Sequence, residues 1–248
     1  MKNLTYLALL CLPAAATADE IRFVGTAKPI NGGDVIYQET HTVSGSCEEG
    51  QFTPTDHSVR YSRQGGSTGE DVFATKELSY AQSALRPDVD FRQPDFSEVL
   101  EITNRDDKTL AISWQAPSGS TEKANLDVRP ELVADAGFDN FVRQSWTSVV
   151  INGESVDFDM VAPTRGDYYG FTLDPTTDDR IDAEHVVRIR PTSRLMRFLV
   201  DPILLGYNAD GILTDYLGLT NIRENEDSNY TAHIRYSINA TPDCELTR

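Results

Sequence analysis

The tripeptide Asp56-His57-Ser58 contains the three residue types of a serine hydrolase triad. The surrounding pattern predicts a strand, where adjacent side chains point to opposite faces, so these three cannot converge on one proton. The sequence has no Gly-x-Ser-x-Gly elbow, no His-Glu-x-x-His motif and no glycine-rich phosphate loop. The four histidines are scattered and are more typical of hydrogen-bonded strand residues than of catalytic bases: His41, His57, His185 and His233. We therefore expect no catalytic residues and no cofactor, and we keep a hydrolase whose residues converge only on folding as an alternative.

Carboxylates crowd one short segment, formed by Asp174, Asp178, Asp179, Asp182 and Glu184. Calcium binds clustered carboxylates, but this spacing does not match the Asp-x-Asp-x-Asp-Gly loop and the glycine is missing. Cysteine and histidine spacing that would suit a transition metal is also absent from the sequence. We expect a solvated loop here and no metal site.

Arginines are concentrated in the segment that follows, at Arg180, Arg188, Arg190, Arg194 and Arg197. Guanidinium groups bind phosphate and carboxylate in a bidentate manner, so this arginine strip is suited to an anionic head group. The alternative is that arginines at alternate strand positions pair with carboxylates on neighbouring strands. We take the last four arginines of the strip as candidate ligand-binding residues.

Aromatic side chains form a second candidate site, made of Phe138, Phe141, Trp146, Phe158, Tyr168, Tyr169 and Phe171. Together they could line a pocket for an amphiphile between a helix and a sheet. The alternative is a closed core, since aromatic residues at the period of an element are usually buried there. For ligand binding we select all of them except Tyr169.

The elements that position these residues are mostly strands. Alternation of apolar and polar residues predicts strands over 35–43, 57–62, 72–80, 99–103, 109–115, 156–160, 168–173, 185–190, 194–200, 212–217 and 230–238. Glycine turns separate them, at 31–33, 65–66, 152–153 and 210–211. The pattern predicts a mainly β protein, with an antiparallel sheet that is coiled or closed into a half or complete barrel.

One segment departs from this alternation. Between Asp135 and Val149, apolar residues recur at intervals of three and four, which predicts a helix that begins at Asp135 or Gly137. Asp139 complements the dipole at its N-terminus. A single helix with such a bulky aromatic face needs a concave sheet to pack against, so we expect it on the concave face.

Residues 1–18 are predicted to be a secretory signal peptide, with Lys2, a short apolar stretch and a cleavage site at Ala18. The mature protein, 19–248, is then expected to be a single β-rich domain in the periplasm or outside the cell. Its two remaining cysteines, Cys47 and Cys244, are expected to form one disulfide in that oxidising compartment, with two free thiols as the alternative.

Charge limits the partners. The 248 residues include 39 acidic and 22 basic side chains and carry a net charge of −17, which argues against nucleic-acid binding. No stretch of about 18 apolar residues exists that would span a membrane as a helix.

Three segments resemble a family of uncharacterised exported proteins of Gram-negative bacteria: 137–143, 158–171 with Pro163 and Arg165, and 216–223 followed by 234–236. The expected half-barrel with a helix in its mouth also resembles, by architecture alone, the Lol-type periplasmic carriers of lipoproteins. We therefore expect a non-enzymatic periplasmic protein that binds or carries a hydrophobic or amphiphilic envelope component. The alternative is a structural or assembly partner of another envelope protein, without a pocket. The oligomeric state is left open.

Overall fold

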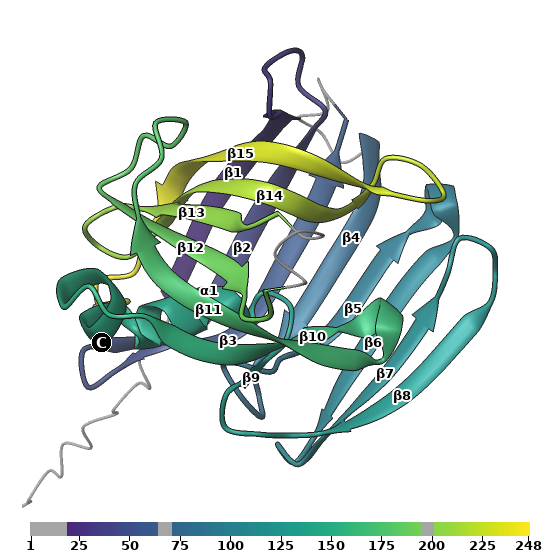
Figure 1. The fold of residues 1–248 in the computed structure, drawn as a ribbon, viewed down its shortest axis with the longest axis horizontal. Coiled ribbons are helices and arrows are strands. Elements are labelled where there is room, and N and C mark those ends of the chain that lie inside the picture. Colours follow the sequence, from purple (N-terminus) through teal and green to yellow (C-terminus); the bar gives the residue numbers. More distant parts are fainter. Residues whose placement is uncertain (1–18, 64–70, 195–200) are drawn as a thin grey trace, which may run out of the picture.

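The computed structural model describes residues 19–63, 71–194 and 201–248. The signal peptide, the glycine turn at 65–66, most of the strand expected over 194–200 and Arg197 lie outside the described residues. A single 15-stranded sheet makes up most of the fold (Figure 1). Neighbouring strands are antiparallel except for one parallel pair, β9 and β10. The mainly β, coiled architecture predicted from the sequence is confirmed.

The first half of the sheet consists of β1 (Asp19–Pro29), β2 (Tyr37–Glu48), β3 (Gln51–Ser62), β4 (Val72–Ser79), β5 (Asp88–Gln93), β6 (Glu98–Arg105), β7 (Thr109–Gln115) and β8 (Thr121–Asp127). The second half consists of β9 (Leu132–Val133), β10 (Val156–Ala162), β11 (Asp167–Thr176), β12 (His185–Pro191), β13 (Ile203–Tyr207), β14 (Leu213–Arg223) and β15 (Asn229–Ala240). The strands β1 and β15 join the halves, so β8 and β9 are the two edges.

The sheet curls until its two ends approach each other, but it does not close (Figure 1). The turn between β10 and β11 presses on β8, where a Cβ on Gly166 would lie 2.7 Å from that of Ala124. The Arg129 guanidinium lies 4.4 Å from the centre of the Tyr168 ring on β11. Side-chain contacts therefore hold together two ends that the strand pairing leaves open.

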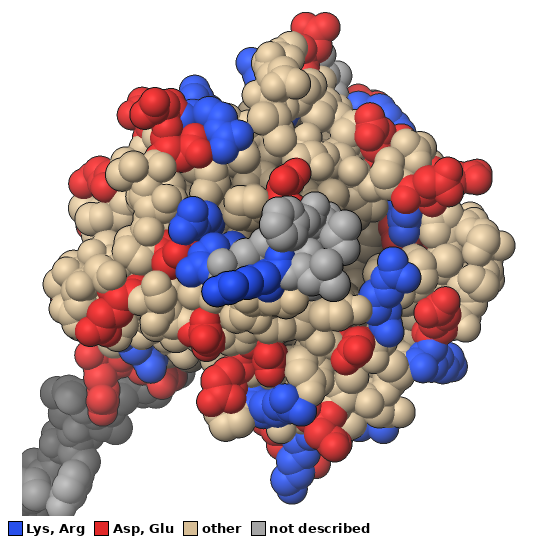
Figure 2. Space-filling view, in the orientation of Figure 1, with Lys and Arg blue, Asp and Glu red and all other residues tan. Residues whose placement is uncertain are grey.

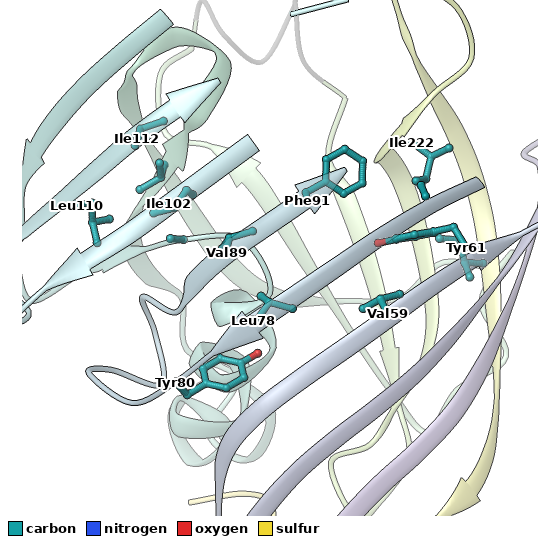
Figure 3. Close-up of a cluster of buried hydrophobic side chains, with 14 of the residues drawn as sticks. Val59, Tyr61, Leu78, Tyr80, Val89, Phe91, Ile102, Leu110, Ile112 and Ile222 are labelled. Atoms are coloured by element: carbon teal, nitrogen blue, oxygen red, sulfur yellow. The ribbon is translucent and has the colours of Figure 1, made fainter. Parts of the chain in front are cut away.

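Alternation along each strand divides the side chains between the inner core and the outer face. On β15, Ala232 and Ile234 are buried, while Thr231 and Arg235 on either side of them are exposed and His233 between them is half-buried. The larger core cluster fills the space inside β3–β7, where Val59, Tyr61, Phe91 and Ile102 lie on the same face of neighbouring strands (Figure 3). Apolar burial of this kind, at about 25 cal/mol per Å², is the main force that stabilises the curled sheet.

One short helix, α1 (Gly137–Gln144), packs against the concave face, as predicted (Figure 1). It begins at Gly137, the later of the two expected starts, because Asp135 takes a left-handed backbone with φ of 44° and turns the chain. Glycine is needed at 137, since a Cβ there would lie 2.1 Å from the Leu85 carbonyl oxygen. The α-helical geometry ends at Gln144, and a π-helical turn, η3 (Thr147–Ile151), follows in place of the continuous helix expected as far as Val149.

The expected disulfide is present. Cys47 and Cys244 are bonded across 197 residues of sequence, with their Cα atoms 5.9 Å apart. The C-terminal tail that follows also contacts α1, because the Arg248 amide donates to the Arg143 carbonyl at 3.1 Å. Its own carbonyl accepts from the Thr147 amide and hydroxyl. Within the described residues, no helix has the length and apolar character needed to cross a membrane.

Candidate functional site

Five of the six selected aromatic residues meet in one cluster around α1, which we call the α1 cluster. Phe141, Trp146 and Phe158 are buried within it, and Phe138 and Phe171 are half-buried at its border. The Phe141 and Phe158 rings lie 4.7 Å apart, and Trp146 packs edge-on to Tyr207 at 5.7 Å. The sixth residue, Tyr168, packs instead on the larger core cluster.

The structure fills this region with side chains from the helix and from β9–β13. Val133, Leu173 and Leu205 are fully buried against the aromatic rings, as core residues are. An amphiphile could enter only if α1 and the strands moved apart. The α1 cluster is therefore continuous apolar packing that ends at the half-buried Phe138 and Phe171.

Polar contacts that the sequence did not predict fix the position of α1. Tyr207 donates its hydroxyl hydrogen to Asp139 at 3.0 Å, and Asn140 donates to the Ala84 carbonyl at 2.9 Å. Arg143 donates to the Gly211 carbonyl at 2.9 Å and pairs with Asp139 one turn earlier. Only the Asp139–Arg143 spacing of four residues offered a sequence signal for these contacts.

Arg188 and Arg190 of the arginine strip lie on the other face of the sheet from the α1 cluster. On β12, Val187 and Ile189 point into the cluster, so Arg188 and Arg190 between and beyond them point outward. Figure 2 shows basic side chains gathered over the β11–β13 part of this face, with acidic side chains around them. The structure therefore separates Arg188 and Arg190 from the aromatic residues of the α1 cluster, because alternation along a strand sends neighbours to opposite faces.

Carboxylates bind three arginines of the strip, Arg180, Arg188 and Arg190. Arg188 and Arg190 both donate to Asp174, at 2.8 and 3.0 Å. Burial alone would raise the pKa of Asp174, but the hydrogen bonds from these two arginines hold it below its usual value. Arg180 forms two 2.7 Å hydrogen bonds with Asp178, and these lower the pKa of that carboxyl to about 2. Arg194 is exposed.

The histidine of the Asp56-His57-Ser58 tripeptide points inward, away from its two neighbours. Its Nε2 lies 2.9 Å from Nδ1 of His41, whose other ring nitrogen lies 3.3 Å from Glu39. Glu39 in turn accepts a 2.8 Å hydrogen bond from the Tyr236 hydroxyl. Burial, followed by the charge of neighbouring His41, lowers the pKa of His57 well below its ordinary value. This is a buried polar chain inside the sheet, and Asp56 and Ser58 take no part in it.

A second buried polar group lies nearby. Lys76 on β4 donates to both carboxylate oxygens of Asp135, at 2.8 and 2.9 Å. The two side chains are 5% and 8% exposed, and the ammonium lies 5.7 Å from the centre of the Phe91 ring. Their pairing joins β4 to the turn that leads into α1. In the parts of the chain that the structure describes, no group of three His, Cys, Asp or Glu side chains is placed to hold a metal ion.

Two hollows lie away from the α1 cluster. The larger, about 600 Å³, is a polar groove on the outer face of β2–β6. Small hydroxyl side chains and carboxylates line it, among them Ser58, Ser79, Asp56, Asp88 and Glu101. The smaller, about 160 Å³, lies where the ends of β2, β4, β5, β14 and β15 meet, and its walls combine aromatic rings with charged side chains.

No protein-family model matches the chain, and a comparison with curated protein sequences found no match. Among solved structures, a β-barrel-like protein of the domain of unknown function DUF1849 from Brucella abortus is similar at 11% identity, with a TM-score of 0.40, over 91% of this chain and 97% of that one. A domain proposed to be an outer membrane lipoprotein-sorting protein, from Vibrio parahaemolyticus, is similar at 9% identity, with a TM-score of 0.25, over 89% of this chain and 83% of that one. Likenesses at this level assign no function to this chain.

Proposed function

We propose that this is a non-enzymatic, exported binding protein of the cell envelope, and that it holds a hydrophobic or amphiphilic component between α1 and the concave face of the sheet. The observation that carries the proposal is the α1 cluster itself. An eight-residue helix places Phe138, Phe141 and the following Trp146 against the concave side of a sheet whose edges are not paired. Such a layer can exchange helix-to-sheet contacts for contacts with an acyl chain.

The energetics are compatible with that exchange. Burial of an acyl chain contributes about 0.8 kcal/mol per methylene, so a long chain offsets the separation of a short helix from its neighbours. Besides the apolar packing, the polar contacts that would have to give way are the bonds of Asn140, Arg143 and Tyr207 described above and the bond from the Arg248 amide to the Arg143 carbonyl. No strand pairing need break, because α1 contributes none.

The anionic head group would bind apart from the acyl chain. Because Arg188 and Arg190 lie on the outer face, they enter the proposal as a separate contact for an anionic group. Such a group would compete with Asp174, which already accepts from both guanidiniums. The acyl chain and the arginine strip are therefore independent parts of the proposal and can be tested apart.

Brominated fatty acids test the acyl site, since bromine quenches tryptophan fluorescence only at contact. The chain has two tryptophans, so Trp114→Phe leaves Trp146 in the α1 cluster and Trp146→Phe leaves Trp114 on β7. We expect saturable quenching in Trp114→Phe and little in Trp146→Phe. Equal quenching in both variants, or none in either, would contradict the proposal.

Co-purification tests the same site under native conditions. Native mass spectrometry of protein taken from its own cell envelope should detect a bound amphiphile. Its absence from repeated preparations, together with an unquenched Trp146, would rule out the acyl site.

A second candidate function is favoured by the outer groove, which is the larger of the two hollows described. An envelope partner that binds there would need no apolar pocket, and a positively charged surface would match its carboxylates. A photo-crosslinking residue at Ser58, inside the groove, should then capture a partner in cells, whereas the same residue at exposed Ser237 on β15 should not. Equal capture at both positions would exclude the groove.

A further inference from the structure

The smaller hollow has the composition of a cation site. Its volume is about 160 Å³, the space of a few water molecules or one small organic group. Tyr37, Phe73, Phe96 and Tyr230 contribute rings to its wall. The Tyr37 ring centre lies 6.2 Å from that of Phe73 and 6.3 Å from that of Tyr230. Aromatic faces carry partial negative charge, and rings grouped in this way attract weakly hydrated cations.

One positively charged side chain of the protein, Arg63, already lies against an aromatic ring of the hollow. The Arg63 guanidinium lies 4.8 Å from the centre of the Phe73 ring, with the Asp95 carboxylate as its counter-ion. The Arg63 side chain is 63% exposed, so only its ring contact and this one ion pair hold it there. The hollow thus accepts a positive group, and the group it now contacts is one that can move aside.

The remaining charges at the rim favour a cation. Arg223 also lines the hollow, but its Nε and one terminal nitrogen donate to Glu98, at 2.9 and 2.8 Å, and its other terminal nitrogen donates to the Glu226 carbonyl at 3.2 Å. The Arg223 and Glu98 side chains are 10% and 6% exposed. The Arg223–Glu98 ion pair therefore has no net charge. Asp95 and the exposed Glu224 then stand against Arg63 alone, which leaves an excess of one negative charge beside the rings.

We propose that this hollow binds an alkylammonium group, such as a quaternary ammonium, and that Arg63 competes with it for the face of Phe73. The site is independent of the α1 cluster, because the ends of β4, β5 and β14 that border it lie away from α1 (Figure 1) and none of its lining residues belongs to that cluster. It therefore goes beyond the acyl-binding function proposed above. The ammonium group could come from a lipid head group or from a free amine, since the recognition chemistry is the same for both.

The direct test compares choline with 3,3-dimethylbutan-1-ol, a neutral molecule of nearly the same shape. Binding is followed in the protein labelled at isoleucine methyls, because Ile36 lines the hollow and exposed Ile151 lies elsewhere. We expect choline to shift the Ile36 methyl signal with millimolar affinity, at least about fivefold more tightly than the alcohol, and to leave Ile151 unmoved. Equal affinity for both molecules, or no shift of Ile36, would overturn the proposal.

Two variants are expected to change the affinity for choline in opposite directions. Phe73→Leu removes the ring and keeps an apolar residue, so choline affinity should fall at least about fivefold. Arg63→Met removes the competing cation, so affinity should rise by about the same factor. Arg60→Met is the matched control for charge, since Arg60 pairs with Glu77 on the outer face, and it should change affinity less than twofold. Weaker choline binding in Arg63→Met would show that the hollow is not a cation site.

Vesicles identify the source. Sedimentation with phosphatidylcholine vesicles that choline inhibits and Phe73→Leu abolishes would assign a lipid head group. Binding of free choline without any vesicle binding would assign a soluble amine. Vesicle binding that choline does not inhibit, with no binding of free choline, would overturn the proposal. None of these three results depends on quenching of Trp146.

Discussion

Two ion pairs, each between a basic side chain and an aspartate, lie on opposite sides of the sheet. Inside, the Lys76 and Asp135 side chains are 5% and 8% exposed. Outside, the Arg180 and Asp178 side chains are 51% and 22% exposed. Both carboxylates have a nearby cation with good geometry, yet only the inner one lacks access to water if that cation is removed. The comparison shows that the role of a charge here is set by the face of the sheet on which it lies.

The inner pair also has a structural task that the outer pair lacks. Asp135 occupies a left-handed turn between β9 and α1, and its carboxylate accepts from the Ala136 amide at 2.7 Å as well as from Lys76. The pair therefore positions the start of α1 relative to β4. The outer pair joins residues only two positions apart, so it constrains one loop and no second element.

The largest effect expected from this comparison follows from Lys76→Met. The change leaves the Asp135 carboxylate buried without its cation, which should lower the free energy of unfolding by about 3–5 kcal/mol. Urea unfolding with the disulfide intact measures this directly.

A double variant separates the buried charge from the lost packing. Lys76→Met with Asp135→Asn removes both charges and keeps a residue that tolerates the left-handed backbone. We expect it to recover at least half of the loss. A single variant that loses less than about 1 kcal/mol, as an exposed pair would, would remove the distinction between the two faces.

Much of the fold could be predicted because alternation survives where one face is buried and the other is solvated. The strand over 109–115 was predicted with the bounds that β7 has, and the helix start at Gly137 and the disulfide are confirmed. The strand β13 was missed because Leu204 and Leu205 are both buried, the first under Ile181 of an outer loop and the second in the α1 cluster. With both faces covered, the polar half of the pattern disappears.

Other strands were missed for the opposite reason. The edge strand β8 is polar on nearly every residue, and only Leu126 is buried, so its sequence resembles a loop. Charged side chains at an edge oppose pairing with other chains, which accounts for this composition. The two-residue β9 gives no period at all, yet both of its residues are fully buried.

The candidate sites show the same limit. Five of the six selected aromatic residues gather around α1, because they are close in sequence or on paired strands, whereas Tyr168 packs on the larger core cluster. The Lys76–Asp135 pair joins residues 59 apart, and the hollow at Phe73 joins β4 to β14 and β15. No local pattern marks such partners, since the curl of the sheet brings them together.

The buried His57 extends the comparison of inner and outer charges to the pH dependence of the free energy of unfolding. Burial holds the folded pKa of His57 well below 6.5, so below that pH the unfolded chain binds a proton that the folded chain does not. The free energy of unfolding should therefore fall as the pH drops from about 6.5, with this one group contributing a slope of up to about 1.4 kcal/mol per pH unit. Chemical unfolding at several pH values between 7.5 and 5 measures it.

His57→Gln tests the assignment, because an amide can still bond to His41 but does not titrate. The slope between pH 6.5 and 5 should be clearly smaller in the variant than in the parent. An unchanged slope would mean that the loss of stability in acid arises at other groups.

The smallest effect is expected on the outer face, from Arg180→Met. Its loss should cost less than about 1 kcal/mol near neutral pH, since water replaces the guanidinium around Asp178. The folded pKa of Asp178 is lowered from 3.8 to about 2. Its ionised carboxylate therefore contributes to the free energy of unfolding above pH 3.8, and this contribution is lost as the pH falls toward 2. Arg180→Met should erase that window and leave the His57 window intact, because the two groups lie on different faces. Unfolding followed from pH 7 to 2 in His57→Gln and Arg180→Met measures the loss of stability due to His57 and that due to Asp178 separately. A change in the His57 pH range in Arg180→Met would show that the two faces are coupled.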